Sequence, residues 1–175
     1  MNIANKLTLF RIILILPFLL VLYLVEGDLG SYIALAIFIV ASLTDLVDGQ
    51  LARRCNLVTD FGKFMDPLAD KMLVLAAMAW FVEMGRMPAW AVLVVLLREF
   101  AVSGLRMVAS EKGRVIAAGW SGKVKTASTM VCVCLMLLPI PPVLNWVCVG
   151  VIVATTLYSG VEYFVKNRDV FKGGL

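Results

Sequence analysis

The sequence predicts an all-α membrane protein with six transmembrane helices. Hydrophobic residues make up 62% of its 175 residues, and the mean hydropathy is +0.95. Soluble domains contain only about 45–50% apolar residues, so this composition places the chain in a lipid bilayer. Apolar runs close to the roughly 20 residues that span a bilayer recur along the chain. No internal repeat or linker divides it, and we expect one membrane-embedded domain over residues 1–175.

Each apolar run ends at a polar or helix-breaking segment. Short turns that start at Glu26, Glu83 and Pro139 end the first, third and fifth runs. Longer polar segments, Cys55–Asp60 and Ser110–Ala118, follow the second and fourth runs. No small-residue cleavage site follows the first run, so we expect it to be retained as a helix. The six predicted spans are Leu7–Val25, Ser31–Gln50, Asp60–Val82, Pro88–Ala109, Gly119–Leu138 and Val143–Val165.

Basic residues are distributed unequally between the predicted turns. Of the 16 lysines and arginines, only Arg86 falls in a turn that follows an odd-numbered span. Because cytoplasmic loops collect basic residues, both termini are expected in the cytoplasm. The net charge of +4 is then concentrated on the cytoplasmic face, where it attracts anionic headgroups or a phosphorylated substrate. No nucleic-acid partner is expected.

Two carboxylates stand near the end of the second apolar run, at Asp45 and Asp48. An aspartate near the middle of a spanning helix costs on the order of 2.5–3.5 kcal/mol on insertion scales, so the pair requires a partner, water or a cation. Both belong to a set of residues at offsets 0, 3, 4, 7 and 8, which is one face of a helix. The residues of that face are Asp45, Asp48, Gly49, Ala52 and Arg53.

The third run carries a second acidic face. Gly62, Asp66 and Asp70 follow one another at intervals of four residues, and Gly62 permits close approach of a backbone or a ligand. Pro67 directly follows Asp66, and we expect it either to lie in the first turn of this helix or to kink it.

Four carboxylates on two neighbouring helices require cations to neutralise them. The chain has no histidine, and so it lacks the commonest transition-metal ligand and the commonest general base. Oxygen ligands suit Mg²⁺ or Mn²⁺. Two such ions can polarise a phosphoryl group and stabilise both the entering and the leaving oxygen, so the sequence predicts phosphoryl transfer with two divalent ions.

The segment "DLVDGQLARRCNLVTDFGKFMDPLAD" fits the pattern D-x2-D-G-x2-A-R-x8-G-x3-D-x3-D at all eight fixed positions. In this segment the chain resembles the CDP-alcohol phosphatidyltransferases. The resemblance implies a six-helix membrane fold, usually homodimeric, in the bacterial inner membrane, with an active site that opens to the cytoplasm. It further implies that Asp70 is the catalytic base. The metal ligands that it implies are Asp45, Asp48, Asp66 and Asp70.

The resemblance also implies that CDP-diacylglycerol is a substrate. Gly49 and Ala52 leave room on the helix for a nucleotide, and Arg53 can bind its diphosphate in the bidentate manner of a guanidinium. Asn5 and Thr8 lie three residues apart, in a segment that approaches the cytidine in the family; the alternative is a polar helix start. The role of Arg11 stays open. The expected CDP-diacylglycerol contacts are Asn5, Thr8, Asp48, Gly49, Ala52, Arg53 and Gly62.

Basic residues in the second half of the chain predict a pocket for a phosphate carried by the acceptor. Arg98 and Arg106 lie eight residues apart, on nearly the same helix face, and Lys123 and Lys125 lie where the fifth span enters the membrane. An arginine as deep as Arg98 is costly in a bilayer. For Lys125 alone, the alternative is a side chain that extends to the lipid headgroups.

Four further segments, "NIANKLTLFRI", "REFAVSGLR", "GKVKT" and "SGVEYFVKN", are similar to the branch of the family that forms phosphatidylglycerophosphate. The implied reaction transfers the phosphatidyl group from CDP-diacylglycerol to glycerol 3-phosphate and releases CMP. Thr129 and Ala4 depart from that branch, in which glutamine and proline are expected. Serine or inositol phosphate is the alternative acceptor.

A cation-coupled transporter would also require carboxylates inside its spans. Carriers place these groups near the bilayer midplane and show repeat symmetry. Here the acidic face continues into Arg53 and a polar loop, and no repeat is visible, so the sequence disfavours transport.

Overall fold

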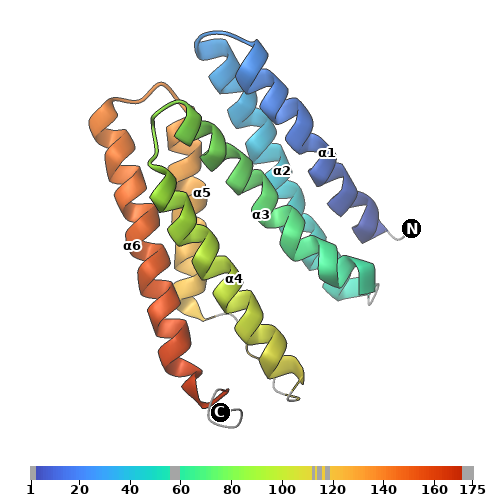
Figure 1. Cartoon of the computed structure of the whole chain (residues 1–175). Helices are drawn as coiled ribbons and strands as arrows, with labels where there is room; N and C mark the ends of the chain where they lie inside the picture. Colours follow the sequence, from blue (N-terminus) through green and yellow to red (C-terminus); the bar gives the residue numbers. More distant parts are fainter. Residues whose placement is uncertain (1–2, 56–59, 112, 114–115, 117–118, 171–175) are drawn as a thin grey trace. The chain divides into compact units, whose positions relative to one another are not determined.

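The secondary structure in the part of the chain that the computed structural model describes consists of helices joined by turns (Figure 1). The backbone is described for residues 3–55, 60–111, 113, 116 and 119–170, and the side chains for residues 9–44, 71–110, 113, 116 and 119–169. No strand occurs in these ranges, so the all-α prediction is confirmed there. The helices are α1 (Ile3–Leu24), α2 (Asp28–Cys55), α3 (Asp60–Glu83), α4 (Ala89–Glu111), α5 (Trp120–Leu137), α6 (Pro142–Lys166) and a short 3-10 helix, η1 (Arg168–Val170).

The helix ends follow the predicted turn signals. Gly27 and Gly85 have φ angles of 77° and 67°, a left-handed conformation that glycine adopts without strain after a helix. Gly30 lies in the first turn of α2, and a Cβ atom there would approach the Val25 carbonyl oxygen to 2.2 Å. Only glycine therefore permits the short connection between α1 and α2. At the start of α6, Pro142 occupies a first-turn position where its missing N–H is not needed.

Pro67 is not a first-turn proline, because α3 begins seven residues earlier at Asp60. The first-turn alternative is therefore wrong. A proline at an interior helical position removes one backbone hydrogen bond from the helix, and it does so here one residue after Asp66.

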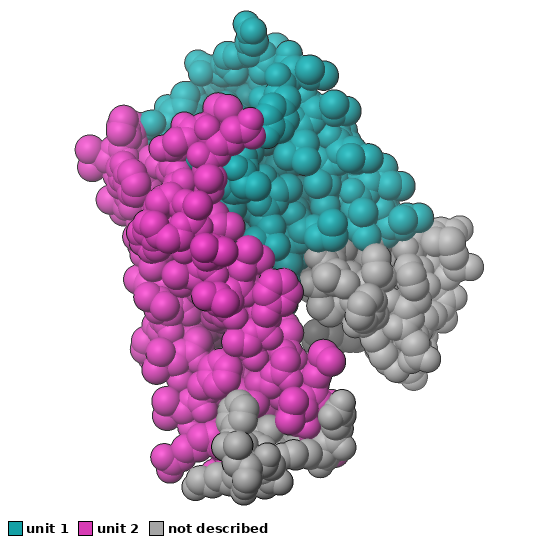
Figure 2. Space-filling model, in the orientation of Figure 1, with its two compact units in different colours: residues 1–81, 133–140 teal, residues 82–132, 141–175 magenta. Residues whose placement is uncertain are grey.

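The molecule divides into two compact units (Figure 2). Unit 1 comprises residues 1–81 and 133–140, and unit 2 comprises residues 82–132 and 141–175. The expectation of a single domain over the whole chain stays a prediction.

In unit 1, α1 packs antiparallel along α2. Phe18 and Phe38 are completely buried, and their ring centroids lie 6.1 Å apart. One turn away, Ile15 and Ala41 are also buried. Small buried residues on α2 let the two backbones approach closely, which is how helices pack when lipid surrounds them. The pairing of Phe18 with Phe38 fixes the register of the helix pair.

In unit 2, α4 packs along α6. Val102, Leu105 and Ala109 on α4 form a buried cluster with Tyr163 on α6. The spacing of three and four residues on α4 is that of one helix face. The same face carries the charged residues of the candidate site.

Many large apolar side chains are exposed, although the buried core is also mainly apolar. Large apolar side chains on the outside include Leu16, Leu97 and Val143, which are 65%, 69% and 76% exposed. Several polar residues are buried within this core, among them Arg11, Lys125, Thr129, Asn145, Thr156 and Ser159. Such a distribution is typical of a protein surrounded by hydrocarbon.

Among the described residues, α6 is the one helix long and apolar enough to cross a membrane, and shorter apolar helical stretches cover Leu9–Leu24 and Asp28–Thr44.

Candidate functional site

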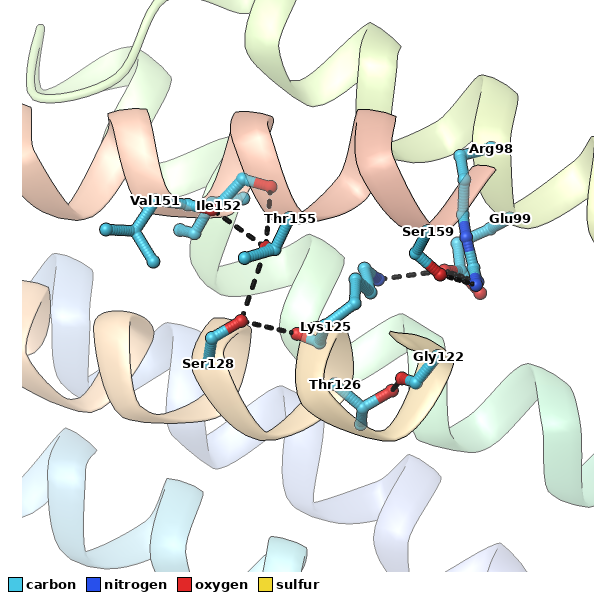
Figure 3. Close-up of polar contacts among 10 residues, drawn as sticks. All are labelled: Arg98, Glu99, Gly122, Lys125, Thr126, Ser128, Val151, Ile152, Thr155 and Ser159. Carbon is cyan, nitrogen blue, oxygen red and sulfur yellow. Dashed lines mark hydrogen bonds and ion pairs between the residues drawn. The ribbon is translucent and has the colours of Figure 1, made fainter. Parts of the chain in front are cut away.

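A charged group of side chains links α4, α5 and α6 within unit 2 (Figure 3). Arg98 on α4 donates from Nη1 to Glu99 Oε1 at 2.8 Å and from Nη2 to Ser159 Oγ on α6 at 2.7 Å. Lys125 on α5 donates from Nζ to Glu99 Oε1, also at 2.8 Å. We refer to Arg98, Glu99, Lys125 and Ser159 as the Arg98 cluster.

The Arg98 cluster is largely shielded from its surroundings. The side chains of Arg98, Glu99 and Lys125 are 13%, 14% and 8% exposed, and Ser159 is 1% exposed. Lys125 therefore does not extend along the surface, and the alternative that it reaches for lipid headgroups is wrong. With two cations and one carboxylate, the cluster carries a net charge of +1.

The neighbouring turn of α5 is tied to α6 by hydroxyl groups. Ser128 Oγ donates to Thr155 Oγ1 on α6 at 3.2 Å, and it also lies 3.0 Å from the carbonyl oxygen of Lys125 (Figure 3). Thr155 Oγ1 donates in turn to the carbonyl oxygen of Val151 at 2.8 Å. The contact between Ser128 and Thr155 holds α5 against α6, about one helical turn away from Lys125 and Ser159.

Two glycines make room for the Arg98 side chain. A Cβ atom at Gly160 on α6 would lie 3.3 Å from Arg98 Cγ, which is closer than ordinary van der Waals contact. A Cβ atom at Gly122 on α5 would lie 3.6 Å from Arg98 Nη2 and 4.0 Å from Ser159 Oγ. The aliphatic part of the Arg98 side chain therefore packs against Gly160 of α6, and its guanidinium lies next to Gly122 of α5.

One donor of the cluster has no partner in the described part of the chain. Arg98 Nε is buried, and none of the described groups accepts a hydrogen bond from it. A buried donor without a partner costs about 1–3 kcal/mol, and more when it is charged. An oxyanion is the natural partner for such an N–H group, because guanidinium binds phosphate and carboxylate oxygens through adjacent donors.

Arg106 lies further along α4 and is held by Tyr163 on α6. Its Nε donates to the Tyr163 hydroxyl at 2.9 Å, and its guanidinium carbon lies 5.5 Å from the centre of the tyrosine ring. Arg98 and Arg106 are separated by about 12 Å of helix rise, whereas Ser159 and Tyr163, which hold them, are about 6 Å apart along α6. The contacts of both arginines with α6 therefore lie one turn apart.

The structure does not place all four predicted acceptor-binding cations together. Arg98 and Lys125 meet at Glu99, and Arg106 contacts α6 one turn beyond Ser159. Lys123 is exposed on α5, whereas Lys125 is buried. Residues 123 and 125 point to different sides of a helix because they are two positions apart.

The predicted metal and nucleotide residues lie outside the residues whose side chains the structure describes. Their backbones are helical, in α1, α2 and α3. The four aspartates therefore keep the one-face spacing on α2 and α3, and a hard oxygen donor set of this kind fits Mg²⁺ or Mn²⁺. Among the side chains that are described, no acidic or cysteine cluster suits a metal ion. The residues concerned are Asn5, Thr8, Asp45, Asp48, Gly49, Ala52, Arg53, Gly62, Asp66 and Asp70.

Arg11 is the buried cation of unit 1. It is only 2% exposed, so it does not lie on the lipid-facing surface of α1. In the antiparallel register set by Phe18 and Phe38, seven residues back along α1 correspond to seven residues forward along α2. The register therefore places position 45 of α2 opposite Arg11.

Glu99, Ser159 and Tyr163 were not singled out by the sequence. Adjacent residues of a helix point about 100° apart, so the meeting of Arg98 and Glu99 is not predicted from their spacing. Ser159 and Tyr163 lie four residues apart in the segment "SGVEYFVKN", and this spacing on an otherwise apolar helix was the available signal.

Thr129, one turn beyond Lys125, is 3% exposed, and its hydroxyl has no hydrogen-bond partner among the described groups.

Comparison with known proteins relates the chain to one family. A profile described as CDP-alcohol phosphatidyltransferase matches residues 1–158. The chain is 44% identical to the CDP-diacylglycerol–glycerol-3-phosphate 3-phosphatidyltransferase of Bacillus subtilis (strain 168), with 98% of this chain and 97% of the relative covered. It is 38% identical to a probable phosphatidylglycerophosphate synthase of Mycobacterium tuberculosis, with 99% and 85% covered. A 3-phosphatidyltransferase of Escherichia coli (strain K12) is 45% identical, with 74% and 73% covered.

The close approach of Arg98 to α6 predicts opposite effects at two glycines of the same helix. We expect Gly160→Ala to destabilise the protein by about 1–2 kcal/mol, because the new methyl group displaces a stem that is held at its far end by two hydrogen bonds. Gly150→Ala is the matched control, since a Cβ atom there meets nothing within 4 Å. It should be neutral or stabilise by up to about 1 kcal/mol. Thermal unfolding in detergent measures both effects. An equal rise in melting temperature for Gly160→Ala and Gly150→Ala would show that Arg98 does not pack closely against Gly160.

Proposed function

The chain belongs to the CDP-alcohol phosphatidyltransferase family, and from this premise we propose that it transfers the phosphatidyl group of CDP-diacylglycerol to glycerol 3-phosphate. The 1-hydroxyl oxygen of glycerol 3-phosphate attacks the β-phosphorus of CDP-diacylglycerol. The bond from that phosphorus to the oxygen shared with the α-phosphate breaks, so CMP leaves and phosphatidylglycerophosphate forms. The Bacillus subtilis relative, whose name describes this reaction, matches 98% of the chain, which supports the assignment.

The Arg98 cluster is the observation that favours a phosphorylated acceptor over serine, and the name of the similar Bacillus subtilis protein favours glycerol 3-phosphate over inositol phosphate. Within the Arg98 cluster two cations contact one carboxylate, and Arg98 Nε has no partner in the described part of the chain. Serine is a zwitterion without net charge, so it would leave the net charge of the cluster unchanged. A phosphomonoester carries nearly two negative charges and several acceptor oxygens, which would offset the desolvation of both cations. Arg106 joins the same site in the proposal, because it contacts α6 one turn away.

We assign the donor side of the reaction to α1, α2 and α3. Asp45, Asp48 and Asp66 hold two divalent ions, Mg²⁺ or Mn²⁺, which when bound polarise the phosphoryl group and stabilise the entering and leaving oxygens. Asp70 takes the proton of the acceptor hydroxyl and shares in binding the ions. Asn5, Thr8, Gly49, Ala52, Arg53 and Gly62 surround the cytidine diphosphate group. The helical spacing of these residues and the chemistry of their side chains support this assignment.

We further propose that all six helices span the bacterial inner membrane, with both termini and the active site on the cytoplasmic side, and that the protein is a homodimer. The exposed apolar side chains on several helices and the buried polar residues support the membrane placement. The asymmetry of basic residues between the turns supports the orientation.

An acceptor panel tests the proposed reaction. Detergent-purified protein is incubated with labelled CDP-diacylglycerol and Mg²⁺ or Mn²⁺, and with glycerol 3-phosphate, serine or inositol phosphate as acceptor. We expect CMP release and labelled phosphatidylglycerophosphate only with glycerol 3-phosphate, and loss of both products when EDTA removes the metal. Preferential use of serine or inositol phosphate would reject the acceptor while leaving the class of reaction intact.

Replacement of the proposed base separates proton removal from substrate binding. We expect Asp70→Asn to lower kcat by about 10²–10⁴-fold, the usual contribution of a general base, because an amide cannot accept the hydroxyl proton. Binding of CDP-diacylglycerol should change little, since Asp45, Asp48 and Asp66 remain. Steady-state kinetics together with equilibrium binding of CDP-diacylglycerol measure the two effects, and a near-normal kcat would rule out Asp70 as the base.

Removal of Arg106 should weaken acceptor binding alone. We expect Arg106→Ala to raise KM for glycerol 3-phosphate by about 10–100-fold, the value of a hydrogen bond between charged groups, and to leave KM for CDP-diacylglycerol nearly unchanged. Arg168→Ala removes an exposed arginine of the same unit and serves as the charge control. Equal increases in both KM values for Arg106→Ala would show that Arg106 does not serve the acceptor specifically.

A further inference from the structure

Glu99 is the acidic member of the Arg98 cluster, and the proposed transfer reaction gives it no role. Its carboxylate is directed between α4, α5 and α6 (Figure 3). One oxygen, Oε1, accepts hydrogen bonds from both Arg98 Nη1 and Lys125 Nζ. A negative charge in a site for an anionic substrate repels that substrate, so its presence requires an explanation.

The shared oxygen limits how far apart the two cationic groups can lie. Each nitrogen is 2.8 Å from Oε1, so the nitrogens are separated by at most twice that distance, about 5.6 Å. Charge-assisted hydrogen bonds to phosphate are about 2.7–2.9 Å long. Two donors at this separation can therefore bind oxygen atoms of one phosphate group. Without the bridging oxygen, two like charges in a shielded site would move apart.

Glu99 Oε1 is an atom that both Arg98 Nη1 and Lys125 Nζ contact, at 2.8 Å each. Ser159 holds the guanidinium on its α6 side, and the stem of Arg98 is confined by Gly160. Lys125 comes from a different helix, and its long side chain has several rotatable bonds. Glu99 is the group that joins the two.

We propose that Glu99 is a positioning residue for the acceptor: it holds Arg98 and Lys125 as a preformed pair at the separation in which one phosphate group is bound. Glu99 does not contact the acceptor and acts only through the two cations. Preorganisation of this kind improves binding because the cost of bringing the donors together is met before the ligand arrives. This role rests on the proposed function, since it concerns the phosphate of the acceptor.

The test compares substitutions that keep or remove the charge. Glu99→Gln keeps the size of the side chain and removes the charge, and we expect it to raise KM for glycerol 3-phosphate about tenfold, within the usual range of coupling energies. Neither kcat nor KM for CDP-diacylglycerol should change by more than about twofold, because the chemical step and the donor site are unaltered. Glu99→Asp keeps the charge on a shorter side chain and should raise the acceptor KM only about threefold. The matched control is Glu162→Gln, which breaks an ion pair with Lys166 on α6 outside the cluster.

A double-mutant cycle with Lys125→Gln tests whether Glu99 acts through the cations. In the Lys125→Gln background, Glu99→Gln should change the acceptor KM by less than about twofold, because one member of the pair is already absent. Multiplicative effects of the two substitutions would reject the positioning role. A fall in the acceptor KM for Glu99→Gln would also reject it, because Glu99 would then compete with the acceptor for the two cations. If Glu99→Gln does not fold, the same cycle is run with Glu99→Asp, and an unchanged acceptor KM for that variant overturns the proposal.

A second measurement separates failure of this proposal from failure of the proposed function. The melting temperature of the purified protein is measured against increasing concentrations of inorganic phosphate and of glycerol 3-phosphate, without CDP-diacylglycerol. Glu99→Gln should require about tenfold more of either ligand for the same stabilisation. An unchanged requirement in Glu99→Gln overturns the positioning role whether or not the wild-type protein transfers to glycerol 3-phosphate. Failure of the wild-type protein in the acceptor panel overturns the proposed function alone.

Discussion

The sharing of one carboxylate oxygen by two cations organises unit 2. Arg98 and Lys125 come from different helices, and a pair of buried positive charges would separate those helices if nothing lay between them. Glu99 Oε1 lies 2.8 Å from both and so joins α4 to α5, while Ser159 joins Arg98 to α6. Glycine at positions 122 and 160 suits this arrangement, because the Arg98 side chain occupies the space that a larger residue would fill.

In unit 1 the charges that would repel one another are negative instead of positive. Its sequence carries the four signature aspartates on α2 and α3, and its described part contains one deeply buried cation, Arg11. The register of α1 and α2 places Arg11 opposite the position of the first aspartate. Each unit thus combines an excess of one charge with a residue of the other sign, and in each case the excess matches a proposed ligand. Divalent cations would neutralise the aspartates of unit 1, and a phosphomonoester would neutralise the cations of unit 2.

The helices could be predicted from sequence because composition and turn residues determine them locally. The six α-helices in the described residues each lie close to a predicted span, and their ends fall near the expected glycine, proline or polar segments, whereas the short helix η1 was not predicted. Contacts between helices were harder to predict. Lys123 and Lys125 have the same chemistry and nearly the same position, yet only Lys125 is buried, which depends on the rotation of α5 about its axis. The role of Glu99 depends on side-chain rotamers of two adjacent residues, which periodicity does not specify.

The division of these residues along the chain explains how one signature can serve several acceptors. The eight signature positions lie between Asp45 and Asp70, within unit 1, whereas the Arg98 cluster and Arg106 lie on α4, α5 and α6 within unit 2. Substitutions in the cluster alter the charge and shape offered to an acceptor without changing any proposed metal ligand. In the proposed function the reaction class is therefore encoded by a short, rigidly spaced segment. Acceptor choice in this proposal depends on contacts such as Arg98–Ser159 and Lys125–Glu99, which join residues 61 and 26 positions apart in the sequence.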